Sequence, residues 1–117
     1  MNTPNESTYA QRQLAFRPIL EEGLRRVAGR YGQYSSASNA SETWLPYHCY
    51  EHSRQVAKSA RWNAAQFALE GIIDVRDVPL VELAAAWHYV EQLQGPGVNE
   101  DVSAGELIEV LQKAGLY

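Results

Sequence analysis

Apolar residues recur every three or four positions along most of this chain, which is the spacing of helices that bury one face. The clearest example is the row Leu20, Leu24, Val27 and Tyr31. No stretch alternates apolar and polar residues over a useful length, so strands are not expected. The pattern predicts an all-α fold, in which a single domain over residues 1–117 forms a bundle of about four to five helices.

Residues that favour helix ends set the expected boundaries of the first helix. Thr8 and Gln11 have the spacing of a capping box, and Gly32 is typical of the residue that ends a helix. Pro18 lies between them and lacks the backbone N–H of a regular turn, so it predicts a kink or a new helix start. Residues 1–6 are polar and are expected to form a disordered tail.

The later helices are expected after a loop at residues 33–45, which is rich in serine, alanine and asparagine. A second helix is predicted over about residues 47–69. Asp77 is a suitable cap for a third helix. Ser103 and Glu106 have the spacing of another capping box, which predicts a short last helix that begins there.

Charge and composition exclude several classes of protein. The net charge is −4, whereas binding to a nucleic-acid backbone needs a basic surface, so no nucleic acid is expected as a partner. Cys49 is the single cysteine, which excludes an internal disulfide and suits a reducing compartment. No long apolar run predicts a membrane span, and the first residues do not resemble a secretory signal. A cytoplasmic location is therefore expected.

Two of the three histidines lie four residues apart, at His48 and His52. On a helix they project from the same face, and the row continues through the apolar residues Val56 and Ala60. Imidazole is the commonest metal ligand, but two ligands are too few for a tight site. His88, in a separate apolar helix, is the available third ligand. Hydrogen-bonded core histidines that bind no metal are the alternative, and it stays open at this stage.

Three motifs in order resemble the HD superfamily of metal-dependent phosphohydrolases. Tyr47-His48-Cys49-Tyr50-Glu51-His52, followed by Val56, is similar to the family's Tyr-His-Asn-x-x-His-x-x-x-Val motif. The stretch Leu83-Ala84-Ala85-Ala86-Trp87-His88 resembles the helix that carries its His-Asp pair. Residues 96–104 resemble the Asn-Glu-x-x-Ser-Ala run that follows. The resemblance covers residues 44–117 and implies an HD-like core over residues 46–117.

The resemblance also implies roles for individual side chains. His52 and His88 would be metal ligands, and His48 would contact the substrate phosphate as a donor or general acid. Glu100 would be a carboxylate near the mouth of the pocket. The metal would be a divalent ion such as iron, manganese, zinc or nickel, which lowers the pKa of a bound water that attacks phosphorus. The implied ligand is a nucleotide or a small phosphoester.

Two positions depart from the family pattern. Tyr89 stands where the family has the aspartate of its His-Asp pair, and a neutral phenol is a poor ligand for a hard divalent cation. The family's last aspartate lies on a helix beyond the point where this sequence stops, so the bundle is expected to lack the family's C-terminal helices. Glu91, three residues after His88, could replace the missing carboxylate or could be a surface residue.

Two hypotheses follow, and they leave open whether the chain is an enzyme. The first is a degenerate HD-like protein that has lost catalysis, binds no metal and acts as a helical interaction or oligomerisation module. The alternative is a divalent-metal-dependent phosphohydrolase. Because missing C-terminal helices would leave an apolar face uncovered, we expect a second copy to cover it in a twofold homodimer.

Two further groups of side chains have alternative interpretations. Arg25, Arg26 and Arg30 form either a solvated helix face or a phosphate clamp. The tryptophans are either core and interface anchors or the walls of a base-stacking pocket. These are Trp44, Trp62 and Trp87.

Overall fold

The computed structural model of the chain describes residues 8–32 and 49–116, and every regular element in these ranges is helical. The helices are α1 (Tyr9–Tyr31), α2 (Tyr50–Leu69), the short 3-10 helix η1 (Val75–Asp77), α3 (Val78–Trp87) and α4 (Val98–Lys113). The prediction of an all-α bundle is therefore confirmed. The expected tail at residues 1–6 and the expected loop at residues 33–45 lie outside the described residues.

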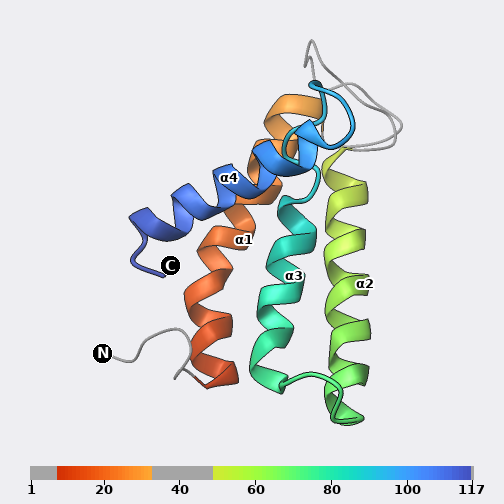
Figure 1. Cartoon of the computed structure of the whole chain (residues 1–117), viewed down its shortest axis with the longest axis vertical. Coiled ribbons are helices and arrows are strands. Elements are labelled where there is room, and N and C mark those ends of the chain that lie inside the picture. Colours follow the sequence, from red (N-terminus) through yellow and green to blue (C-terminus); the bar gives the residue numbers. More distant parts are fainter. Residues whose placement is uncertain (1–7, 33–48, 117) are drawn as a thin grey trace.

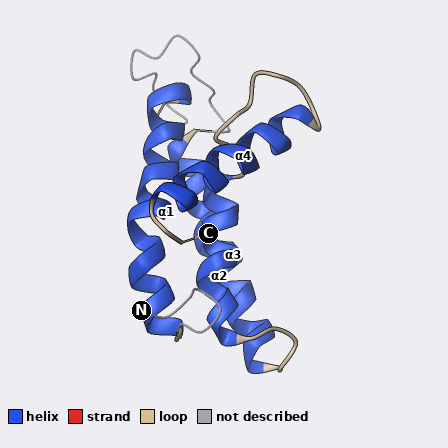
Figure 2. Ribbon diagram, turned by 60° about the vertical axis from the view of Figure 1, so that its left-hand side comes forward, coloured by secondary structure: helices blue, strands red, loops and turns tan. Residues whose placement is uncertain are grey.

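Three helices lie side by side, and the fourth crosses them. Figure 1 shows α3 between α1 and α2, and α3 packs against both. This central position suits its sequence, because Glu82 is its only charged residue. Helix α4 crosses one face of this layer and packs on α1 and α3, as the turned view in Figure 2 also shows. Among the described helices, none combines the length and the apolar character needed for a membrane span.

The start of α1 follows the predicted capping box. The Thr8 backbone N–H donates to Gln11 Oε1 at 2.9 Å, and the Gln11 N–H donates to Thr8 Oγ1 at 3.2 Å. Pro18 lies inside α1, which continues as one helix to Tyr31, so no new helix begins at the proline. Asp77 is the N-cap residue of α3, as predicted, although its side chain makes no capping hydrogen bond.

The predicted start of the last helix is wrong by about one and a half turns. Helix α4 begins at Val98, because the Gly97 N–H donates to Glu100 Oε2 at 2.7 Å and this contact caps the helix. Asn99 orders the preceding turn by accepting from two backbone N–H groups. Ser103 is buried inside α4, and its Oγ accepts from the Glu91 N–H at 3.0 Å. The serine thus holds α4 against the segment after α3.

Among the described residues, Trp87 has the largest fully buried side chain, and it joins α1 to α3. Its Nε1–H donates to the Ile19 carbonyl at 2.9 Å. Gly23 faces the indole so closely that a Cβ atom there would lie 2.5 Å from Nε1. Tyr31 makes a second polar contact in the core, since its hydroxyl donates to the Val90 carbonyl at 2.8 Å. Core packing thus fixes the relative position of the two helices.

The arginines near the end of α1 divide between two environments. Arg25 is exposed and pairs with Glu22 in its own helix, as expected for a solvated face. Arg26 and Arg30 bind Glu106 of α4, at 2.9 and 2.7 Å, and Arg26 also pairs with Glu22 at 2.9 Å. Hydrogen bonds from Arg30 lower the pKa of Glu106 below its ordinary value. These two arginines therefore join α1 to α4.

Candidate functional site

The structure brings two of the predicted metal ligands, His52 and His88, against one tyrosine. His52 lies in the first turn of α2, and His88 directly follows the last residue of α3. The ring of Tyr89 lies 5.6 Å from the ring of His52 and 4.8 Å from that of His88, measured between centroids. Both distances are ordinary for contacting aromatic rings. The two helices therefore converge here, at one end of the bundle.

The candidate metal ligands that the described residues place beside Tyr89 are two imidazoles. His52 is half-buried and His88 is exposed. His48, the predicted phosphate contact, lies outside the described residues. Within residues 8–32 and 49–116, no group of three or more histidine, cysteine, aspartate or glutamate side chains is placed to hold one ion. The described residues of this cluster thus supply two imidazoles and one phenol.

The two predicted carboxylates have local structural roles. Glu100 caps the start of α4 through the Gly97 N–H. Glu91 Oε1 accepts from the Leu93 N–H at 2.9 Å and so closes the turn after α3. Each carboxylate therefore accepts a hydrogen bond from a backbone N–H. This structural role requires no metal.

A second feature is an apolar hollow between α2, η1 and α3, with a volume of about 600 Å³. We call it the Trp62 surface. Trp62, Leu69 and Val75 lie on it with 65%, 83% and 53% of their area exposed. Ala65 and Ala68 lie among these larger residues. Contiguous apolar surface of this kind commonly marks an interaction site.

Polar residues border the Trp62 surface along one edge. Arg61 Nη2 donates to the Tyr9 hydroxyl at 2.9 Å, and its Nη1 lies 3.9 Å from Glu82. This arginine therefore links α1, α2 and α3. Of the three tryptophans, Trp62 is exposed and therefore is not a core residue, whereas Trp87 lies in the core. Trp44 lies outside the described residues. Trp62, Ala65 and Leu69 are spaced by three and four residues, and this spacing alone would have placed them on one face of a helix.

Comparison of the chain with models of known protein families, with curated proteins and with solved structures found no match. The class of protein is therefore defined by the fold and the two sites alone. It is an all-α bundle that carries a His-Tyr-His cluster at one end and an exposed apolar surface on α2.

Proposed function

We propose that this chain is a degenerate HD-domain-like protein that has lost catalysis and acts as a helical oligomerisation module. The observation that carries the proposal is the exposed Trp62 surface. The His-Tyr-His cluster supports the loss of catalysis, because the phenol of Tyr89 stands where the resemblance requires a metal-binding carboxylate. The occupant that we propose for the Trp62 surface is a second copy of the chain.

The pattern of side chains on α2 supports self-association. The stripe formed by Arg61, Trp62, Ala65, Ala68 and Leu69 is centred on Ala65. An antiparallel pair of α2 helices with its twofold axis at Ala65 would place Trp62 against the partner subunit's Ala68. A large residue would then pack against a small one, and Ala65 would let the two helices approach closely. The surface is therefore self-complementary in shape.

The mass of the protein in solution tests this proposal. We expect light scattering after size exclusion to give a dimer for the native chain. In the same arrangement Leu69 faces the partner subunit's Arg61, so Leu69→Lys places two cations together and should produce monomers. Leu14→Lys is the matched control, because Leu14 is 74% exposed on α1 and lies outside the Trp62 surface. A native monomer at 100 μM would refute the proposal.

The alternative function is a divalent-metal-dependent phosphohydrolase, and the convergence of His52 and His88 on Tyr89 is the observation that favours it. In that case the untagged protein should contain stoichiometric iron, manganese, zinc or nickel. The metal should be lost in His52→Ala and retained in Lys113→Ala, which alters an exposed side chain of α4. Metal-free native protein without activity on nucleotides or small phosphoesters would exclude this function.

A further inference from the structure

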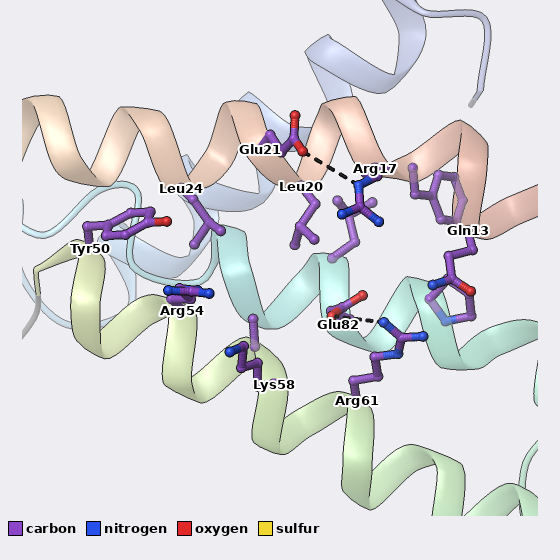
Figure 3. A pocket seen from close by; sticks show the side chains of 14 residues that line it. Gln13, Arg17, Leu20, Glu21, Leu24, Tyr50, Arg54, Lys58, Arg61 and Glu82 are labelled. Carbon is purple, nitrogen blue, oxygen red and sulfur yellow. Dashed lines mark ion pairs between the residues drawn. The ribbon is translucent and has the colours of Figure 1, made fainter. Parts of the chain in front are cut away.

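A groove separate from the His-Tyr-His cluster runs between α1 and α2, and α3 forms its floor (Figure 3). Its volume is about 400 Å³, within the range of small-molecule sites. Leu20 and Leu24 are half-buried and line it from α1, and the fully buried Leu83 closes its floor from α3. The groove therefore offers apolar surface to a ligand along its α1 wall.

The walls of this groove carry four cations, although the chain as a whole has a net charge of −4. Arg17 extends from α1, and Arg54, Lys58 and Arg61 extend from α2, as Figure 3 shows. We call this feature the basic groove. An anion would find a local attraction here that the acidic remainder of the molecule does not provide.

Two of the four cations are already paired with carboxylates. Arg17 lies 3.6 Å from Glu21, and Arg61 lies 3.9 Å from Glu82. Both carboxylates line the same groove, so they neutralise part of its charge.

The other two cations of the groove are Arg54 and Lys58. Within residues 8–32 and 49–116, neither side chain has an ion pair or a hydrogen bond. They lie four residues apart on α2, where like charges repel and destabilise the helix. An anion bound between them would remove this repulsion and would also accept their hydrogen bonds.

From these contacts we propose that the basic groove binds a small organic anion with an apolar body. The carboxylate or phosphate of the ligand accepts hydrogen bonds from Arg54 and Lys58. Its apolar body lies on Leu20 and Leu24 along the α1 wall. A neutral ligand of the same shape would leave the two cations unpaired, so charge as well as shape should select the ligand. The basic groove differs from the Trp62 surface, although Lys58, Arg61 and Glu82 line both.

Decanoate and decanol are a matched pair of probes, because they share the chain length and differ in the charged end. We expect calorimetry on the whole protein to give a Kd of about 0.1–1 mM for decanoate, the range reached by ligands of this size. Decanol should bind at least tenfold more weakly. Decyl phosphate distinguishes the two head groups, since tighter binding than decanoate would identify a phosphate ligand.

Variants locate the binding and control for net charge. Arg54→Gln with Lys58→Gln should raise the Kd for decanoate at least tenfold. Arg25→Gln with Lys113→Gln removes the same two charges outside the groove and should leave the Kd within twofold of native. Leu69→Lys should also leave the Kd for decanoate unchanged, because Leu69 does not line the basic groove. Loss of the dimer and loss of ligand binding can therefore be told apart. Circular dichroism confirms that each variant is folded.

Three results would overturn the proposal. The first is equal affinity for decanoate and decanol in the native protein, a test that needs no variant. The second is unchanged decanoate affinity after loss of Arg54 and Lys58. The third is no binding of either anionic probe at 5 mM.

Discussion

A methyl group added at Gly23 should destabilise the bundle, whereas the same group added at Gly29 should stabilise it. Both glycines lie in α1, so alanine at either position gains about 0.5–1 kcal/mol in helix propensity. A Cβ at Gly23 would lie 2.5 Å from Trp87 Nε1 and 2.7 Å from two indole carbons. A Cβ at Gly29 has no neighbour within 4 Å.

The cost at Gly23 follows from how firmly the indole is held. Trp87 is 1% exposed, its Nε1–H binds the Ile19 carbonyl, and the guanidinium of Arg26 lies 5.0 Å from its ring. Forcing an extra methyl group into a packed core costs about 1–3 kcal/mol. Loss of the indole hydrogen bond adds about 1 kcal/mol. After the gain in propensity, Gly23→Ala should lose about 2 kcal/mol net.

Urea unfolding followed by circular dichroism measures both variants. Gly29→Ala should gain about 0.5–1 kcal/mol, so the two variants should differ by about 3 kcal/mol. With Trp87→Phe in the background the ring is smaller, and the penalty of Gly23→Ala should shrink. Equal stabilisation by the two alanines would refute the reasoning, because it would mean that the indole does not hold its observed position against Gly23.

Three further predictions concern polar contacts between elements. Glu106→Gln should lose about 1–2 kcal/mol at pH 7, with the partial exposure of Arg30 limiting the effect. The pKa of Glu106 is lowered in the folded state, so its contribution to stability is present above the ordinary glutamate pKa and is lost as the pH falls through the folded value. The unfolding free energy of this variant should therefore decline less than that of the native protein from pH 7 to pH 3. Parallel declines would contradict a stabilising role for the Glu106 carboxylate. Ser103→Ala should lose about 1 kcal/mol in urea, because the Glu91 N–H loses its acceptor, whereas Ala104→Ser, at an exposed neighbouring position, should cost only about 0.5 kcal/mol of helix propensity. Tyr31→Phe takes away the acceptor of the Gln92 N–H and one of the two donors to the Val90 carbonyl, which keeps Arg30 Nη1, and should lower the unfolding free energy by about 1–2 kcal/mol; no loss would show that the Gln92 N–H finds another acceptor.

Local signals in the sequence were sufficient for the class of fold and for several helix ends. The three-to-four spacing predicted the helices, and Thr8 with Gln11 predicted the start of α1, because such hydrogen bonds join residues within one turn. The same reasoning failed at Ser103. A capping box is a local pattern, and a serine with that pattern can instead accept a hydrogen bond from a distant segment, as Ser103 does from Glu91.

The arrangement of the side chains was decided by tertiary packing. Spacing along α2 placed His52 on a helix face, but only the packing of α2 against α3 brought its ring to Tyr89 beside His88. Arg26 and Arg30 were cations on a helix end in the sequence, and they bind Glu106 because α4 crosses α1. A sequence determines which face of a helix is apolar, since that depends on residues a few positions apart. Which helix covers that face depends on contacts between distant segments, and these exist only in the folded chain.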